Sequence, residues 1–477
     1  MRDHATLRIG LLGVGLAEYW PQFDGLYERL LGYLATVEGR LGGHGREVVS
    51  FGLVDNPEQA LQTGHEARAK DMDILVIHVT TYALSSLLLP IVRRAKVPVL
   101  LLDLQPAAAI DYTAFNALAD RTVMTGNWLA YCCACPIPEF ANVFARCGVP
   151  LHQIHGVLED DPACWREVEE WLEAARTVHV LSHTTLGLMG HYYSGMLDIA
   201  TDLTAVCHIF GVHLEHLEVD ELSRMRQAAG EAEVAAQLSA ICKTLDVHED
   251  CATEELERAA RTSAGLHQFA QKYRLGALAY YYKGTGVAAN EDTMSSIILG
   301  TSLLTASGVP VAGEYEIKKV LAMKILDTLG AGGSFTEYYA VDYDDDAVLM
   351  GHDGPGHPGI AQSKVRVRPL EVYHGKVGKG LSVEMSVKSG PVTLLSVVES
   401  KQHGFHLLVA EGEAVPGPHL EIGNTNSRYR FSLGARGFMH AWNSHSPAHH
   451  CAVGVGHVAS VLEKIGALLG IAVVRVC

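Results

Sequence analysis

Two kinds of long run are missing from this chain of 477 residues. No uninterrupted apolar stretch reaches the length that spans a bilayer, and the lysines and arginines form no extended cluster. The first absence argues against a membrane protein, and the second against a surface for nucleic acid or anionic lipid. The formal net charge of -17, from 54 acidic and 37 basic residues, agrees with the second point. We therefore expect a small polar molecule as the partner, with no nucleic acid and no membrane.

The cysteine pairs of a structural zinc site are also missing. Cys132, Cys133 and Cys135 are clustered, but no second pair completes a tetrahedral site, and most of the 10 cysteines lie in apolar segments. This usage is typical of small buried side chains in a reducing compartment. The N-terminal segment leads directly into a short apolar strand rather than into a signal peptide. We expect a cytoplasmic protein.

The chain has enough apolar side chains for several hydrophobic cores, because 48% of its residues are hydrophobic. In the first part of the chain, strand patterns alternate with helical patterns. The strands are expected at 7–13, 47–54, 73–79 and 97–102, and the helices at 23–40 and 83–94. Such alternation predicts a parallel sheet with helices on both faces.

The middle of the chain continues the α/β pattern, with a strand expected at 177–182, a helix around 193–206 and a strand at 212–219. From about Glu337 the pattern changes to short strands between glycine-rich turns, at 365–373, 381–388, 392–398 and 405–409. The fold class is therefore α/β: two doubly wound parallel-sheet domains, residues 1–173 and 174–328, followed by a β-rich, antiparallel barrel-like C-terminal domain, residues 329–477.

The loop after the first strand is a candidate ligand site. Its start, 13–18, is similar to a dinucleotide-binding fingerprint, but Glu18 occupies the place of the third glycine, which argues against a nucleotide. Open α/β sheets usually bind ligands at the carboxyl ends of their strands. Tyr19, Trp20 and Gln22 lie there and would suit a sugar, although a packing role between domains explains the aromatic residues equally well.

Four residues of the last third form a candidate metal site: Glu314, Glu337, His352 and His450. Glu314 precedes a helix expected at 316–329, Glu337 enters a strand after several glycines, and His352 follows a strand at 347–350. Oxygen and nitrogen ligands without a thiolate suit a hard or borderline ion such as Mn²⁺. Taken alone, each residue could be an ordinary capping charge or surface histidine. Other histidines compete as ligands: His357, His445, His449 and His457.

At these residues the chain resembles the L-arabinose isomerase family and, more distantly, the L-fucose isomerases. The order and approximate separations of four motifs agree with the family, and the resemblance spans most of the chain. The motifs are Ala312-Gly313-Glu314 before a lysine-bearing helix, Gly333-Ser334-Phe335-Thr336-Glu337-Tyr338-Tyr339, Leu349-Met350-Gly351-His352, and Ala448-His449-His450.

The resemblance implies that Glu314, Glu337, His352 and His450 hold one divalent ion, usually Mn²⁺, with Co²⁺ or Mg²⁺ as alternatives. It also implies that the two glutamates move protons during aldose–ketose isomerisation of a small sugar through a cis-enediol. Members of the family build their sites near subunit interfaces, so the resemblance implies a homo-oligomer.

The chain departs from the family around the substrate. The stretch 125–132 lacks the family's glycine-rich segment with a substrate-contacting histidine, and a second histidine, His357, follows His352. His357 and His449 are therefore candidates for substrate or metal contact, and a branched, shortened or acidic sugar competes with L-arabinose. Two other functions remain open: an epimerase or another enediolate-forming enzyme on a sugar acid, and a non-catalytic sugar-binding protein. The intact set of four ligands argues against the last.

Overall fold

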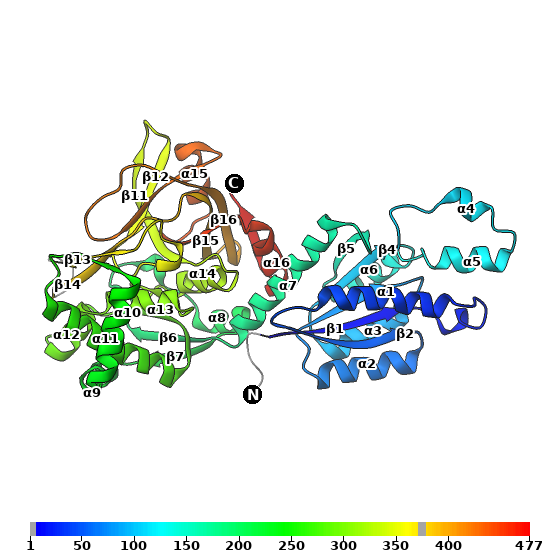
Figure 1. Ribbon diagram of the computed structural model, residues 1–477, viewed down its shortest axis with the longest axis horizontal. Helices are drawn as coiled ribbons and strands as arrows, with labels where there is room; N and C mark the ends of the chain where they lie inside the picture. The colour runs from blue at the N-terminus through cyan, green and yellow to red at the C-terminus, as the bar shows by residue number, and fades with distance from the viewer. Residues whose placement is uncertain (1–5, 371–377) are drawn as a thin grey trace. The chain divides into compact units, whose positions relative to one another are not determined.

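The computed structural model describes residues 6–370 and 378–477, and its contacts divide the chain into two compact units, Met1–His179 and Val180–Cys477. Figure 1 shows the helices and strands of each unit. The strand predicted at 365–373 and the turn after it run through 371–377, which lie outside the described residues.

The first unit is built on a parallel sheet of five strands in the order β2-β1-β3-β4-β5. The strands are β1 (Leu7–Val14), β2 (Arg46–Val54), β3 (Ile74–Val79), β4 (Val99–Gln105) and β5 (His152–Val157). All six residues of β3 are buried, as expected for a parallel strand covered on both faces. The predicted doubly wound sheet is confirmed here.

Seven helices belong mainly to this sheet: α1 (Leu26–Leu41), α2 (Pro57–Ala69), α3 (Ser85–Ala95), α4 (Tyr112–Asn116), α5 (Arg121–Leu129), α6 (Ile137–Arg146) and α7 (Pro162–Ser182), after a 3-10 turn at Ala17–Tyr19. Helix α3 contacts both α2 and α6. Helix α1 buries Leu26, Leu30, Leu34, Val37 and Leu41, an apolar stripe with helical spacing. Figure 1 shows α4 and α5 in an excursion beyond the end of the sheet.

The strand predicted at 177–182 is wrong, because these residues form the end of α7, and the next strand, β6 (Thr185–Gly190), begins after them. The β-branched residues favoured a strand, but Thr177 and Leu181 are buried four residues apart, on one helical face. The helix predicted around 193–206 is α8 (Leu203–Phe210), preceded by a 3-10 turn at Leu197–Ile199. Asp202 caps it by accepting from the N–H groups of Thr204 and Ala205, which fixes the later start.

The second unit begins with a second parallel sheet, in the order β10-β9-β6-β7. Its other strands are β7 (His213–Leu217), β9 (Leu275–Tyr281) and β10 (Val311–Ala312). The helices are α9 (Val219–Ala228), α10 (Glu231–Thr244), α11 (Thr253–Tyr273), α12 (Ala288–Ser295), α13 (Ile298–Ala306) and α14 (Ile317–Thr328). The α/β pattern predicted for the middle of the chain is thus confirmed.

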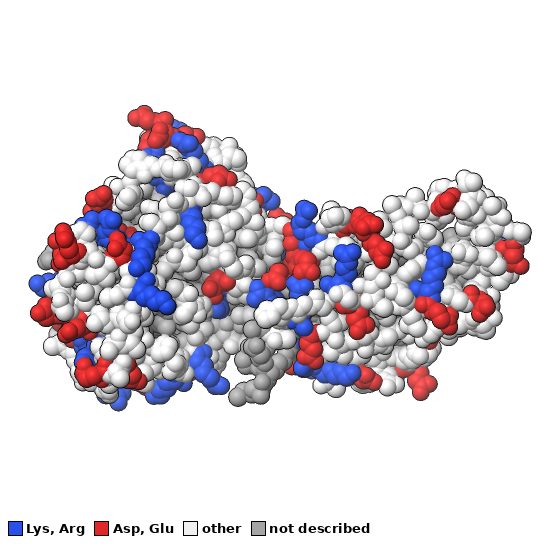
Figure 2. Space-filling model, in the orientation of Figure 1, with Lys and Arg blue, Asp and Glu red and all other residues white. Residues whose placement is uncertain are grey.

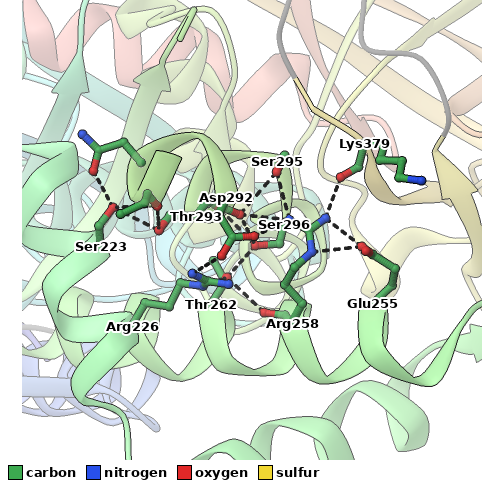
Figure 3. A network of polar contacts seen from close by, with 12 residues as sticks. Ser223, Arg226, Glu255, Arg258, Thr262, Asp292, Thr293, Ser295, Ser296 and Lys379 are labelled. Atoms are coloured by element: carbon green, nitrogen blue, oxygen red, sulfur yellow. Dashed lines mark hydrogen bonds and ion pairs between the residues drawn. The ribbon is translucent and has the colours of Figure 1, made fainter. Parts of the chain in front are cut away.

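A polar network fastens α12 to α9 and α11 (Figure 3). Arg226 and Arg258 both bind Asp292, with Nη1 to carboxylate distances of 2.5 Å and 2.9 Å. Behind this pair, the hydroxyl groups of Thr262 and Ser296 lie 2.6 Å apart in a buried hydrogen bond. Two cations shared by one carboxylate fix the position of α12 from two directions.

Six antiparallel strands of the second unit close into a barrel. The sheet order is β15-β18-β11-β12-β17-β16-β19, and β15 also pairs with β16, which closes the ring and leaves β19 attached to β16. The strands are β11 (Ser334–Asp342), β12 (Ala347–His352), β15 (Gly390–Ser400), β16 (Gly404–Val415), β17 (Thr425–Phe431), β18 (His450–Val455) and β19 (Ala472–Arg475), with helices α15 (Gly434–Ser444) and α16 (Ala459–Leu469). The barrel-like character predicted for the C-terminal part is confirmed.

The barrel and the helices of the second parallel sheet share a hydrophobic core. One buried cluster joins Ala260 and Leu299 to barrel residues such as Val348, Leu394 and Val453. A short sheet in the order β14-β13-β8 adds to it, with β8 (Asp246–Val247), β13 (Arg366–Leu370) and β14 (Gly380–Glu384), beside a 3-10 turn at Pro358–Ile360. The boundaries of the three predicted domains stay predictions.

No helix in the described part of the chain is long and apolar enough to cross a bilayer. On the face that Figure 2 presents, acidic and basic side chains are interspersed. This distribution agrees with the absence of an extended lysine and arginine cluster from the sequence.

Gly351 of β12 lies very close to the backbone of the neighbouring strand β17. A Cβ atom at this position would lie 1.9 Å from the carbonyl oxygen of Thr425 on β17. We expect Gly351→Ala to destabilise the second unit by about 3 kcal/mol, because the strands must separate to admit the methyl group. Thermal unfolding followed by circular dichroism measures this. As a control, Gly39→Ala in α1 meets nothing within 4 Å and should not lower the melting midpoint. An unchanged midpoint for Gly351→Ala would contradict this packing.

Candidate active site

Glu314 lies in the short connection between β10 and α14, and its backbone is unusual. Glu314 has a φ of 58° and Tyr315 a φ of 62°, two successive non-glycine residues in the left-handed region. This conformation costs about 1–3 kcal/mol for each residue and persists only where the surroundings impose it. Here the N–H of Tyr315 donates to the carbonyl oxygen of Tyr280 at 3.0 Å, and the N–H of Glu316 to that of Gly313 at 3.1 Å. These hydrogen bonds hold the connection, and with it the backbone of Glu314, in one conformation.

Glu337 and His450 are brought together by strand register. Glu337 of β11 lies opposite His450 of β18 and, on the other side, opposite Gly351 of β12. Residues directly opposite in an antiparallel sheet project from the same face, so the carboxylate and the imidazole share one side of the barrel wall. The ring of Phe335 lies 4.4 Å from the rings of both His352 and His450, and these two imidazoles are 5.1 Å apart. Phe335 thus sets their spacing.

His450 lies between two glutamates of the α14 connection. Its Nε2 is 3.1 Å from Oε2 of Glu314, and its Nδ1 is 3.5 Å from Oε2 of Glu316. The ring is almost completely buried. Burial lowers the pKa of His450, but its contacts with the carboxylates of Glu314 and Glu316, and their charge, outweigh this effect and raise the pKa to about 9.

Buried charges continue behind His450. Glu316 and Lys319 are both completely buried, and the Nζ of Lys319 donates to the Ser396 hydroxyl at 2.6 Å and to the Val397 carbonyl at 2.9 Å. Burial raises the pKa of Glu316, but the charge of Lys319 and the contact with His450 outweigh it and lower the pKa. Burial lowers the pKa of Lys319 to about 8. The ionised Glu316 therefore orients His450 through Nδ1 and leaves Nε2 facing Glu314.

The Nε2 atom of His449 faces both Glu314 and Glu337. Its Nε2 lies 3.9 Å from Oε2 of Glu314 and 3.9 Å from Oε2 of Glu337. Its Nδ1 is 2.6 Å from Oδ2 of Asp198, and its backbone N–H donates to the same oxygen at 3.0 Å. Burial raises the pKa of Asp198, but the contacts with His449 outweigh it and lower the pKa to about 2. Asp198 thus holds the imidazole from the far side of the ring.

The segment that carries Asp198 is itself held in place. The Nζ of Lys318 donates to the carbonyl oxygens of Asp198, Ile199 and Ala200 at 3.0, 3.0 and 2.8 Å. Asp198 was missed by the sequence analysis, because it lies 251 residues from His449 and no local motif marks it. Lys318 lies in the lysine-bearing helix that follows Glu314, but no sequence pattern indicates its contact with 198–200.

The carboxyl group of Glu337 is suited to proton transfer. It is 30% exposed, on the side of a cavity. Burial and the charge of Glu314 raise the pKa of Glu337, against opposing effects of His450 and His449, and the result is a raised value. A carboxyl group with a raised pKa exchanges protons more readily near neutral pH.

A cavity of about 430 Å³ opens beside these groups and is lined by Glu314, Glu337 and His352. This volume lies within the range of small-molecule sites. The lining is completed by Gly313 and Gly354 and by the side chains of Tyr280, Tyr282, Met294, Ile297, Ile298, Tyr338, Tyr339, Asp353, Leu420, Ile422 and Asn424.

The structure brings together five of the nine predicted site residues: Glu314, Glu337, His352, His449 and His450. Of the other four, Tyr19, Trp20 and Gln22 belong to the first unit, and His357 belongs to the second. In the first unit, Nε1 of Trp20 donates to Asp55 at 2.7 Å, Nε2 of Gln22 donates to the carbonyl of Glu18 at 2.6 Å, and Tyr19 stacks edge-on against Trp20. The buried His357 accepts from the N–H of Gly359 at 3.1 Å and does not line the cavity. Their contacts with substrate stay predictions.

The donor set fits a divalent cation. Glu314, His449 and His450 each offer one ligand atom, and these atoms lie within 4.8 Å of one another. The nitrogen of His450 that faces Glu314 is backed, through Nδ1, by a buried carboxylate, as metal-binding imidazoles usually are. Glu337 and His352 adjoin this group. Carboxylates and imidazoles without a thiolate suit Mn²⁺ and similar ions.

Comparison with known proteins agrees with this geometry. Residues 332–472, which contain Glu337, His352 and His450, match the family model of the L-arabinose isomerase C-terminal domain. The chain is also 23% identical over 323 residues to an L-arabinose isomerase of Shewanella baltica (strain OS223), a match that covers 64% of this chain. The match spans 63% of that relative, somewhat less than two thirds of its length. Together with the four motifs and their places in the fold, these matches support a divergent member of the L-arabinose isomerase family.

Proposed function

We propose that the protein is a sugar isomerase that interconverts an aldose and a ketose, with Glu314 and Glu337 as its proton-transfer pair. One observation carries this proposal. Carboxylates from two separate elements, the β10–α14 connection and strand β11, face one cavity of about 430 Å³, and both lie 3.9 Å from the same nitrogen of His449.

The reaction needs two proton-transfer groups at one pair of carbons. A proton must leave the carbon beside the carbonyl group and return to the neighbouring carbon, by way of a cis-enediol. The raised pKa of Glu337 suits the group that takes up and returns this proton. Glu314, held by its strained backbone, would move the proton between the two substrate oxygens. His449, oriented by Asp198, would donate a hydrogen bond to a substrate oxygen between them.

A bound divalent ion would belong to the same site. Glu314, Glu337, His352 and His450 would hold it, with Mn²⁺ as the first choice and Co²⁺ or Mg²⁺ as alternatives. Such an ion, when bound, polarises a carbonyl oxygen and stabilises negative charge that develops on it. The homo-oligomer with sites near subunit interfaces and the cytoplasmic location are further parts of the proposal.

The test uses the purified protein, stripped of metal with a chelator and then supplied with Mn²⁺. A panel of aldoses, ketoses and sugar acids is incubated in deuterated water, and exchange at the carbon beside the carbonyl is followed by NMR. We expect Mn²⁺-dependent exchange together with ketose formation. Exchange without ketose formation would replace the proposal by an epimerase or another enediolate-forming enzyme. A complete lack of exchange would exclude both and leave a binding protein.

Metal binding also has a readout that is independent of turnover. A ligand that binds only the folded state stabilises it, by about 2.7 kcal/mol at a free concentration one hundred times its Kd. We therefore expect Mn²⁺ to raise the melting midpoint of the stripped protein. Glu314→Gln should remove most of this increase, whereas Glu413→Gln, at an exposed position of β16, should retain it. Equal increases in both variants would place the ion elsewhere.

A further inference from the structure

A second cavity of the second unit, about 370 Å³ in volume, is lined by the first half of the connection between β16 and β17. The rest of its lining comes from the segment that leads into β13, from the end of β14 with the segment after it, and from β17. Glu314, Glu337 and His352 do not line it. It is therefore separate from the proposed catalytic cavity, and its volume lies within the range of small-molecule sites.

Cationic side chains dominate the lining of this cavity. They are those of Lys364, Arg366 and Arg428. The one carboxylate among the described lining residues belongs to Glu384, and both of its oxygens are already engaged. Oε2 of Glu384 accepts from Nε of Arg368 at 3.0 Å, and Oε1 accepts from the N–H of Gly423 at 3.1 Å. The lining is thus cationic in a chain whose formal net charge is -17.

Arg428 is the buried member of the three, with 8% of its side chain exposed. Its Nη2 is shared by the carboxylates of Asp342, at 2.9 Å, and Asp345. Its buried Nε has no hydrogen-bond partner in the described part of the chain. The guanidinium group is therefore fixed at one edge and incompletely paired at another. An unpaired donor on a buried cation is costly, and a negative charge placed beside it offsets this cost.

The other two cations are exposed and only weakly engaged. Nε of Arg366 is 3.4 Å from Oδ2 of Asp246, and both side chains are about half exposed, which makes this a weak pair. Nζ of Lys364 donates to the carbonyl oxygen of Cys242 at 3.4 Å, and no ion pair to a carboxylate is present for it among residues 6–370 and 378–477. Both side chains can therefore turn to an anion at little cost.

Hydrogen bonds hold the frame of this cavity together before any ligand binds. The N–H of Gln362 donates to the carbonyl oxygen of Ser386 at 2.7 Å, and the N–H of Ser389 donates to Oε1 of Gln362 at 2.7 Å. The N–H of Val387 donates to the hydroxyl oxygen of Ser427 on β17 at 2.8 Å. These contacts join the segments before β13 and after β14 to β17, so the cations are carried by a preformed frame. The lining serines add hydroxyl groups that can donate to an oxygen anion.

We propose that this cavity binds a phosphate group, either as the free ion or as the monoester of a small metabolite. A phosphate monoester carries a charge of about -1.5 to -2 at neutral pH and three strong acceptor oxygens. Three cations and several hydroxyl groups match this charge and these oxygens, and arginine and lysine are the usual partners of phosphate in proteins. An uncharged ligand would leave the cations without a counter-charge. The site does not depend on the proposed isomerase function.

The experiment is a calorimetric titration of the full-length protein with glycerol 3-phosphate, inorganic phosphate and glycerol. Glycerol 3-phosphate has no carbonyl group and cannot undergo aldose–ketose isomerisation. We expect one equivalent of either phosphate compound to bind per chain, more weakly as the salt concentration rises, and glycerol not to bind. Tighter binding of the ester would identify a phosphorylated metabolite as the source of the phosphate group, and equal affinities would identify the free ion.

Two variants locate the binding site. Lys364→Ala and Arg366→Ala should each raise the Kd for glycerol 3-phosphate by about tenfold, as expected for the loss of one charged hydrogen bond. Both positions are exposed, so the fold should be retained. The control is Lys401→Ala, which removes an exposed lysine between β15 and β16, outside the lining, and should leave the Kd within about twofold.

The same titrations on metal-stripped and Mn²⁺-loaded protein distinguish this cavity from a metal site. We expect the same Kd in both forms. Binding that requires Mn²⁺ would place the phosphate on the metal, and unchanged affinity in both Lys364→Ala and Arg366→Ala would place it elsewhere on the protein. Either result would overturn the inference, as would a lack of binding by both phosphate compounds. None of these results bears on the isomerase proposal, because the measurement does not involve turnover.

Discussion

Glu337→Gln is expected to lower kcat/KM by about 10³-fold or more while leaving the fold intact. Glutamine has nearly the shape of glutamate but cannot accept or return a proton, and a positioned acid or base contributes about 10²–10⁴-fold. The backbone of Glu337 stays paired with β12 and β18, so the strand does not depend on the charge. Because the pKa of Glu337 is already raised by burial, removing the charge should not destabilise the protein. Steady-state kinetics and circular dichroism measure the two effects.

The control for this variant is Glu413→Gln in β16 of the same barrel. Glu413 is exposed and lies opposite Arg430 of β17, outside the cavity lining. Its activity should stay within about twofold of the unmodified protein, as expected of a surface position. Near-normal activity of Glu337→Gln would show that the proton-transfer pair has been assigned to the wrong residues.

Asp198→Ala is expected to lower kcat by about 10- to 100-fold, the usual effect of removing a group that orients a residue in a metal or catalytic site. Asp198 accepts both from the ring and from the backbone of His449. Without it, nothing fixes which nitrogen of His449 faces Glu314 and Glu337. We expect turnover to fall more than the Mn²⁺ affinity, measured by calorimetry, because Glu314 and His450 keep their own contacts.

Conservative replacement distinguishes positioning from a loss of structure. Asp198→Asn keeps an acceptor oxygen and should retain more activity than Asp198→Ala. Asp202→Asn, four residues further on, keeps the cap of α8 and should be nearly unchanged, because asparagine caps helices as well as aspartate does. If Asp198→Ala were as active as the unmodified protein, His449 would not need its partner, and the proposed role of this pair would be wrong.

The sequence predicts most of the regular structure near the site because the local signals there are strong. The helix expected at 316–329 is α14, Ile317–Thr328, and the strand expected at 347–350 is β12, Ala347–His352. Four short motifs also pointed to Glu314, Glu337, His352 and His450, which the barrel and the α14 connection bring together. Motif order sufficed here because three of these residues lie on neighbouring barrel strands.

The residues that support the site could not be predicted in the same way. Asp198 reaches His449 across 251 residues, and only the folded chain sets this contact. Glu316 was visible two residues after Glu314, but a glutamate before a helix usually caps it in solvent. In the structure it is completely buried beside His450, and the charge of Lys319 helps to keep it ionised. The prediction of a strand at 177–182 was wrong for a related reason, because the packing of α7 outweighed the local preference of these residues for a strand.

Closure of the barrel fixes Glu337 and His450 relative to each other, but it does not fix every residue that lines the cavity. In a closed ring every strand has a neighbour on both sides, so Glu337 and His450 cannot slide past each other without disrupting the whole barrel. Other residues that line the cavity, such as Met294 of α12 and Ile422 between β16 and β17, lie outside the barrel strands and can accept substitutions singly. These cavity residues can therefore change while the proposed proton-transfer pair stays in place.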